Sequence, residues 1–163
     1  MKNELITVGL GELHLSKDPN CVLVCYGLGS CIGVAMFDNI HQVAAMAHVV
    51  LPDSSMARAQ DSPAKFADTC IPTMIELLEK RGARRNNLSV KLAGGAQVLT
   101  VPGGNNRLDV GNRNIDAIQQ ALAKANMRPA ATDLGGNFGR TMQLYVDGGK
   151  VTIRAVGKPE RPL

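Results

Sequence analysis

A cysteine and a histidine are the side chains in this sequence whose types and surroundings point to chemistry. Cys31 ends the stretch Tyr26–Cys31, YGLGSC, which lies between two apolar runs with the composition of strands. A free thiol has a pKa of about 8.5, so only a few per cent of it is thiolate at neutral pH. A neighbouring imidazole, such as that of His48, can take the thiol proton and leave a nucleophilic sulfur. Buried packing, a metal ligand and the wall of a phosphate loop are the other roles open to Cys31.

Two glycines, Gly27 and Gly29, precede this cysteine. Glycine permits a positive φ angle and the close approach of another backbone segment. The amide N–H groups of Gly29, Ser30 and Cys31 could then converge on a developing oxyanion. A tight turn between strands is the plainer explanation of the glycines. Nucleotide binding is disfavoured, because GLGSCIG is one residue too long for the dinucleotide fingerprint and the chain has no P-loop motif.

The separation of Cys31 and His48 depends on the register of a hairpin predicted over residues 31–50. A symmetric two- or four-residue connection within Asp38–His41 places Phe37 opposite Gln42 and Cys31 directly opposite His48. Directly opposed residues share a face, with β-carbons about 5 Å apart. A three-residue connection would instead put the two side chains on opposite faces. The face of Cys31 carries small residues that would leave space over the thiol, and the other face is uniformly apolar and is expected to be core.

The remaining cysteines, Cys21, Cys25 and Cys70, add no recognisable metal site. The spacing Cys-x3-Cys-x5-Cys lacks the paired Cys-x2-Cys units of structural zinc sites. Cys70 falls on the apolar stripe of a predicted helix and is assigned to the core. The N-terminal residues do not have the pattern of a secretory signal, so we expect a cytoplasmic protein with reduced thiols.

The elements that must position these residues are strands and two helices. Strands are predicted, from their composition and alternation, at residues 4–9, 21–26, 31–37, 42–50, 88–93, 142–146 and 151–156. The last two are joined by Asp147–Lys150, DGGK, a strong hairpin signal. We expect mixed α/β (α+β) layers in which the helices cover a sheet, within a single domain over residues 1–163.

Both helices are predicted from apolar residues at helical spacing. The first is expected to begin with Ser62 as N-cap and Pro63 as first residue, and to stop at Gly82. Pro72 lies inside this pattern and should kink the helix or shorten its first half. The second helix is expected from about residue 112 to residue 126.

The composition argues against several classes of partner. The net charge is +4, but only two tyrosines, three phenylalanines and no tryptophan are present to stack on bases, so nucleic acid is not expected. The longest apolar run, Val43–Leu51, is interrupted by His48 and is far shorter than the ~20 residues of a membrane span, so no membrane insertion is expected. A mildly basic surface suits an acidic protein partner better.

Around Cys31 and His48 the sequence resembles the CheD family of chemoreceptor glutamine deamidases. Gly27–Cys31, GLGSC, is followed by Met46–Pro52, MAHVVLP. Further blocks match in order: KFADT at 65–69, KLAGGA at 91–96, GNRN at 111–114 and DLGGN at 133–137. The resemblance covers roughly residues 4–157, and so many ordered blocks make it specific.

This resemblance implies hydrolysis of selected glutamine side chains on the cytoplasmic helices of chemotaxis receptors to glutamate, with release of ammonia. Cys31 corresponds to the nucleophile, which forms a thioester, and His48 to its base. Gly29 and Ser30 belong to the loop that holds the oxyanion and the substrate. Neither a metal nor an organic cofactor is implied. Many members of the family also bind the chemotaxis phosphatase CheC, which competes with the receptor for the same surface.

The resemblance also implies a fold and a third site residue. The family has a three-layer α/β/β sandwich with mixed sheets and two main helices on one side, and its active site is similar to that of the cytotoxic necrotizing factor toxins. Members carry a threonine six residues before the nucleophile, which helps to orient the histidine. Cys25 occupies that position here. Because a thiol is a poor hydrogen-bond partner, either a backbone carbonyl orients the ring or Cys25 only packs in its strand.

Two alternatives to the deamidase remain open from the sequence. The altered residue at position 25 is compatible with a protein that mainly binds and regulates CheC and has weak or no deamidase activity. A transglutaminase would keep the same cysteine chemistry and transfer the acyl group to an amine instead of water.

Overall fold

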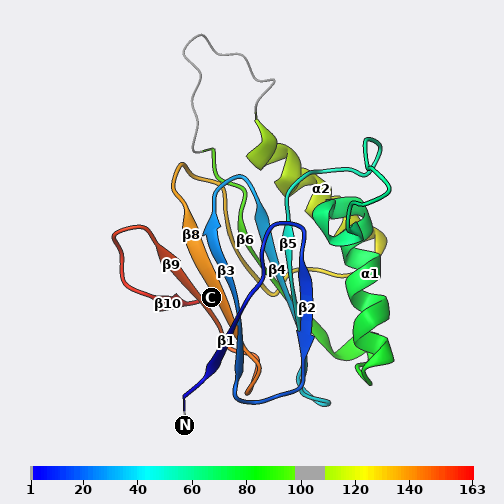
Figure 1. Cartoon of the computed structure of the whole chain (residues 1–163), viewed down its shortest axis with the longest axis vertical. Coiled ribbons are helices and arrows are strands. Elements are labelled where there is room, and N and C mark those ends of the chain that lie inside the picture. The colour runs from blue at the N-terminus through cyan, green and yellow to red at the C-terminus, as the bar shows by residue number, and fades with distance from the viewer. Residues whose placement is uncertain (1, 98–108) are drawn as a thin grey trace.

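Two mixed five-stranded sheets and two helices form three layers in the computed structural model, which describes residues 2–97 and 109–163. The outer sheet has the order β1-β3-β8-β9-β10, and the central sheet has the order β2-β5-β4-β6-β7. Figure 1 shows that both helices lie on the side of the central sheet that faces away from the outer sheet. This confirms the expected α/β/β sandwich with its main helices on one side.

The strands of the outer sheet are β1 (Glu4–Thr7), β3 (Cys21–Leu28), β8 (Arg140–Tyr145), β9 (Val151–Ala155) and β10 (Arg161–Pro162). Those of the central sheet are β2 (Leu13–Ser16), β5 (Val43–Val49), β4 (Ile32–Asp38), β6 (Leu88–Gly94) and β7 (Ala131–Leu134). The helices are α1 (Ala67–Lys80) and α2 (Val110–Lys124), with short 3-10 turns η1 (Pro63–Lys65) and η2 (Arg85–Asn87). In each sheet one neighbouring pair is parallel, β1 with β3 and β6 with β7, and the other pairs are antiparallel.

Strands β4 and β5 are buried at every residue because they are covered on both faces. One face packs on the helices; its members are Ile32, Val34, Met36, Val43, Ala45, Ala47 and Val49, against α1 and α2 residues such as Ile71, Met74, Leu78, Ile118 and Leu122. The alternate residues, Ala35, Phe37, Ala44 and Met46, pack between the sheets with Leu23, Cys25, Met142, Leu144 and Ile153. Fully burying a large apolar side chain contributes about 1.5–3 kcal/mol, so both interfaces hold the layers together.

All seven predicted strands are present with small differences at their ends, and the hairpin at Asp147–Lys150 joins β8 to β9. Strands β2, β7 and β10 were not predicted. They span only four, four and two residues, which is too short for an alternating pattern to stand out.

The first helix begins later than predicted. Ser62 does act as a cap, since its side chain accepts the N–H of Ala64, but it caps only η1. Phe66 then takes an extended conformation (φ −116°, ψ 137°), and α1 begins at Ala67 and continues through Pro72. The second helix matches its prediction to within two residues at each end.

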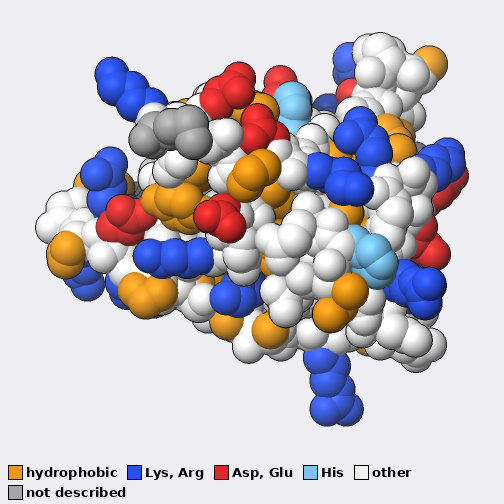
Figure 2. Space-filling view, turned by 90° about the horizontal axis from the view of Figure 1, so that it is seen from below, with side chains coloured by type: hydrophobic (Ala, Val, Ile, Leu, Met, Phe, Trp, Pro, Cys, Tyr) orange, Lys and Arg blue, Asp and Glu red, His pale blue; other side chains and the backbone are white. Residues whose placement is uncertain are grey.

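None of the described helices is long and apolar enough to cross a membrane. Figure 2 shows the molecule from the lower end of Figure 1, where the β4–β5 hairpin lies, and basic and acidic side chains are interspersed on that surface. The end that carries Cys31 is the opposite one, where β3 ends and β4 begins.

Candidate active site

The turn between β3 and β4 consists of Gly29, Ser30 and Cys31, and we call it the Cys31 turn. The pairing of β3 with β8 shifts between Cys25 and Leu28, and Gly27 in that interval has a φ of 60°. A bulge of this kind bends a strand and changes the direction in which the chain leaves it. The positive φ at this bend therefore falls on Gly27, which explains a glycine at that position. Gly29 has a φ outside the left-handed region.

The three carbonyl oxygens of the Cys31 turn all accept hydrogen bonds. That of Gly29 accepts the N–H of Ala96 at 2.8 Å, and that of Cys31 accepts the N–H of Gly95 at 2.9 Å. The carbonyl of Ser30 accepts the side-chain amide of Asn114 at 2.9 Å. None of the three amide N–H groups of the turn donates to a group within the described residues. Hydrogen bonds to its carbonyls thus hold the turn in place, and its three backbone N–H groups have no acceptor among the described residues.

Gly94 and Gly95 support the Cys31 turn by close approach. A β-carbon on Gly94 would overlap the carbonyl oxygen of Cys31, and Gly94 has a φ of 114°. Only glycine fits such a position without displacing its neighbour. Contact with the turn that carries Cys31 therefore accounts for Gly94 of the block KLAGGA, whereas a β-carbon on Gly95 would overlap the side chain of Ile115.

His48 lies opposite Gly33 of β4, so the prediction that it directly opposes Cys31 is wrong by two residues. The hairpin loop spans residues 39–42, because Asp38 still pairs with Val43. The buried carboxylate of Asp38 accepts the N–H groups of the next turn, which closes the hairpin later than expected. Gln42 takes a φ of 54° to complete the loop.

A shift of two residues keeps each side chain on its original face of the sheet. Gly33 faces the outer sheet, since a β-carbon there would contact Met142 and Leu28, and His48 beside it faces the same way. Cys31 packs against the same cluster between the sheets and is partly exposed. Cys31 and His48 thus share a face on a diagonal, a relation in which α-carbons lie about 7–8 Å apart.

The backbone of the β1–β2 connection holds His48. Nδ1 of its ring lies 3.0 Å from the carbonyl oxygen of Val8. Because that partner can only accept, Nδ1 carries the hydrogen and Nε2 presents its lone pair. Nε2 is buried and has no hydrogen-bond partner among the described residues. The backbone of His48 also pairs with Gly11 and Glu12 on the same connection. The ring is oriented with its basic nitrogen unused.

Cys25, in the position of the family threonine, is fully buried between the sheets. Within the described residues, the only hydrogen bond of its side chain is from the sulfur to the carbonyl of Ala47, at 4.0 Å. Burial, followed by the charge of Cys31, raises the pKa of this thiol well above its usual range. The group found on the His48 ring is the carbonyl of Val8 instead.

Burial acts on the pKa of both reactive groups in the direction that favours their neutral forms. Desolvation raises the pKa of the Cys31 thiol. It also lowers the pKa of His48, against smaller opposing effects from the Val8 carbonyl and from Glu12. At neutral pH the resting pair is therefore a thiol and a neutral imidazole.

Sequence reasoning did not find three residues that hold this arrangement: Val8, Asn114 and Arg140. Arg140, which is 2% exposed, donates to the carbonyls of Gly94, Asp133 and Gly135 and so ties the ends of β6 and β7 together. Asn114 belongs to the GNRN block of the family resemblance, which implied no role for it. Val8 acts through its backbone, for which no side-chain signal exists.

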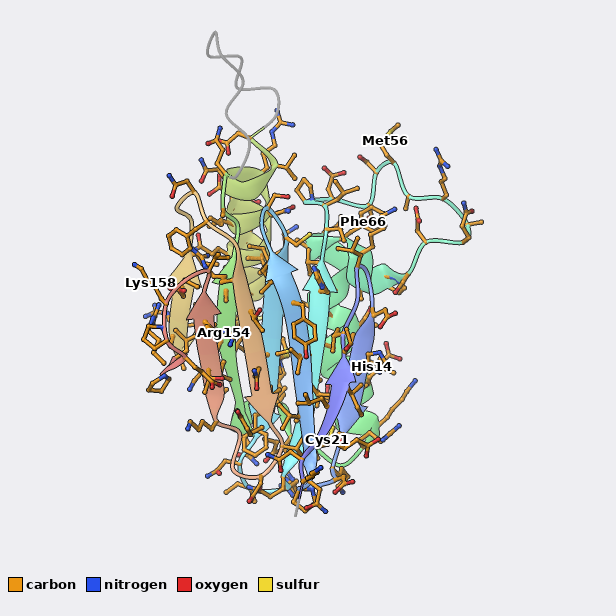
Figure 3. All side chains as sticks on the ribbon, turned by 60° about the vertical axis from the view of Figure 1, so that its left-hand side comes forward. His14, Cys21, Met56, Phe66, Arg154 and Lys158 are labelled. Carbon is orange, nitrogen blue, oxygen red and sulfur yellow. The ribbon has the colours of Figure 1, made fainter. Side chains whose placement is uncertain are left out.

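Two hollows in the described part of the chain are lined by neither Cys31 nor His48. One of about 410 Å³ is lined by Gly27, at the end of β3, and by Arg154 and Lys158, which Figure 3 places on the β9 side of the molecule. A larger hollow of about 760 Å³ lies between α1 and α2, on the other side of the central sheet from the cluster that contains Cys31. Within residues 2–97 and 109–163, no three His, Cys, Asp or Glu side chains are close enough together to hold a metal ion.

Comparison with known proteins gives a distant structural neighbour and close sequence relatives. The crystal structure of a Bacillus licheniformis hypothetical protein, YfiH, superposes with a TM-score of 0.47 at 11% identity, covering 83% of this chain and 59% of that one. This likeness is too weak to carry an argument. A family model described as CheD chemotactic sensory transduction matches residues 50–155, a range that begins after His48.

Relatives found by sequence extend the match over the site. A Symbiobacterium thermophilum protein named "Probable chemoreceptor glutamine deamidase CheD" is 48% identical over 160 residues, 98% of this chain and 97% of that protein. A Clostridium botulinum protein (strain Eklund 17B) of the same name is 40% identical over 157 residues, 96% of each chain. On the family model and these full-length matches, the chain belongs to the CheD family.

Proposed function

We propose that this protein hydrolyses specific glutamine side chains of chemoreceptors to glutamate, with Cys31 as nucleophile and His48 as base. One observation carries the proposal: His48 has Nδ1 anchored on the Val8 carbonyl and a buried Nε2 without a partner among the described residues, on the sheet face that Cys31 shares. Leaving a buried polar atom unpaired costs about 1–3 kcal/mol. Such a cost is typical of sites where the atom is reserved for a substrate or a proton.

The first step forms a thioester. The sulfur of Cys31 attacks the side-chain carbonyl carbon of the glutamine while Nε2 of His48 takes the thiol proton. Since burial keeps the resting pair neutral, proton transfer accompanies the attack rather than preceding it. The C–O π electrons move to oxygen, where free N–H groups of the Cys31 turn can stabilise the charge. The tetrahedral intermediate then collapses, the C–N bond breaks, and the His48 proton leaves with ammonia.

The second step releases glutamate. Water gives a proton to Nε2 of His48 and attacks the thioester carbon, and the C–S bond breaks. The proton returns to sulfur, so the enzyme regains its neutral thiol and imidazole. One water is consumed and one ammonia is released per glutamine, with no change of oxidation state.

The surface at the Cys31 end suits a protein substrate. Large apolar side chains are exposed toward that end of the molecule, on loops at Leu10, Leu51, Phe138 and Val156 and at Tyr26 near the end of β3. Met56, which is 85% exposed, extends from the loop after β5 (Figure 3). Exposed apolar groups gathered around a site indicate docking of another macromolecule. The relatives are named as chemoreceptor glutamine deamidases, which supports a chemoreceptor as the substrate, and we propose its cytoplasmic helices as the partner.

Mass spectrometry of receptor peptides tests the proposal. Wild-type protein should add about one mass unit at particular glutamines and release an equal amount of ammonia. Cys31→Ala should abolish this, and His48→Gln should slow it by about 10²–10⁴-fold. Cys70→Ala is the matched control: Cys70 lies on the buried face of α1, in the core between the helices and the central sheet, so its replacement should leave the rate unchanged.

Three outcomes would contradict the proposal. No deamidation by wild type, together with binding and stimulation of CheC, would favour the regulator. Incorporation of an added primary amine in preference to water would favour a transglutaminase. Equal rates for wild type and Cys31→Ala would remove Cys31 from the mechanism.

A further inference from the structure

We propose that Asn114 is a positioning residue for the reaction at Cys31: it fixes the peptide between Ser30 and Cys31, so that the Cys31 N–H is presented to the oxyanion. The inference rests on the proposed function and adds to it a residue on α2 that touches neither substrate nor nucleophile. It depends on the contacts of one buried side chain with two backbone carbonyls.

Asn114 lies in the second turn of α2 and is fully buried. Its Nδ2 donates to the carbonyl of Ser30 at 2.9 Å and to the carbonyl of Val50 at 3.0 Å. An amide nitrogen has two hydrogens, so both are used. Because both neighbours are acceptors, the side chain has only one suitable orientation, with its nitrogen toward them.

The bond to Ser30 acts on the donor of Cys31 through a single peptide plane. In a trans peptide the carbonyl and the following N–H point in opposite directions. Holding the Ser30 oxygen toward α2 therefore directs the Cys31 N–H away from the helices. A hydrogen bond to the carbonyl also polarises the peptide and strengthens its N–H as a donor. This N–H donates to no group within the described residues, so it is free for substrate.

Ser30 is the member of the Cys31 turn that no backbone group secures within the described residues. The carbonyls on either side of it, Gly29 and Cys31, accept backbone N–H groups from Ala96 and Gly95. Without Asn114 the peptide between Ser30 and Cys31 would lose the group that holds its oxygen, and rotation of that plane would withdraw the Cys31 N–H.

The second bond connects the nucleophile to the base. Val50 follows His48 by two residues, directly after β5. One side chain thus joins the backbone beside Cys31 to the backbone beside His48. Oδ1 of Asn114 is buried without a partner among the described residues. An apolar residue would avoid that unpaired atom, so the amide is retained for its two donated bonds.

Asn114→Leu tests this role, because leucine has a similar size and donates nothing. We expect kcat for receptor-peptide deamidation to fall by about 10²-fold, as for a misplaced oxyanion donor, with KM within about threefold of wild type. Alkylation of Cys31 by iodoacetamide should keep its wild-type rate, because it forms no oxyanion. Asn114→Asp should likewise lower kcat while KM and the alkylation rate stay near wild type, since it keeps the shape of the side chain and replaces the donors by acceptors. Asn112→Leu, on the exposed side of the same helix, is the control.

The outcomes separate this inference from the proposed function. If wild type deamidates and both Asn114 variants retain kcat, only the inference is overturned. It is also overturned if kcat and the alkylation rate fall together with the melting temperature in both variants, which marks a purely structural residue. If wild type does not deamidate at all, the proposed function fails first, and the positioning role fails with it.

Discussion

His48 can accept the thiol proton only while its ring is neutral, so its pKa sets the acid limit of the reaction. Burial lowers that pKa from 6.5. We therefore expect kcat/KM to rise with pH through a midpoint below 6.5. A pH–rate profile of peptide deamidation measures the midpoint. An acid limb centred above pH 7 would contradict the assignment, because it would require a histidine stabilised in its charged form.

The ring of His48 contacts the Val8 carbonyl and not Cys25, so we expect Cys25 to contribute packing rather than orientation of the base. Cys25→Ala should keep deamidation within about threefold of wild type and lower the free energy of unfolding by about 1–2 kcal/mol, the cost of a small cavity between the sheets. Cys25→Thr, which restores the family residue, is the comparison. A loss of 100-fold or more in Cys25→Ala, with the fold intact by circular dichroism, would make Cys25 a functional member of the site.

Among the elements, the end of β6 determines the shape of the Cys31 turn. Gly94 and Gly82 both have a positive φ, but only at Gly94 would a β-carbon overlap Cys31. Alanine at either position should cost about 1–3 kcal/mol of backbone strain. Gly94→Ala should in addition lower kcat by at least about tenfold, whereas Gly82→Ala should leave kcat unchanged. Equal kcat values for the two variants, after correction for the folded fraction, would contradict the role assigned to Gly94.

For the whole molecule, the shared burial of β4 and β5 predicts one cooperative unit. Cys25 reports on the core between the sheets and Cys70 on the core beneath the helices. Both thiols should become accessible at the same urea concentration, because β4 and β5 belong to both cores and cannot unfold for one alone. Labelling followed by peptide mass spectrometry measures each midpoint. Separate midpoints would show that the helical layer unfolds independently and would contradict the proposal of a single domain over residues 1–163.

Local patterns in the sequence determined most of the strands and helices and the shared face of Cys31 and His48. The uniformly apolar face of the predicted hairpin indicated the core that packs on the helices, and side-chain parity placed Cys31 and His48 on one face. The two side chains stay on one face although the predicted register was wrong. Side chains alternate between faces with a period of two residues, and the observed register differs from the predicted one by two residues. Ordered blocks along the chain identified the CheD family before any contact was known.

The tertiary structure alone decided which groups hold the site. The Val8 carbonyl lies 40 residues from His48 along the chain, and the Asn114 amide lies 84 residues from Ser30. The hairpin register depended on the buried Asp38 carboxylate, and the start of α1 on the extended Phe66. Periodicity reports on neighbours within one strand or helix. Hydrogen bonds between distant backbone and side-chain groups depend on how the layers pack, so no local pattern specifies them.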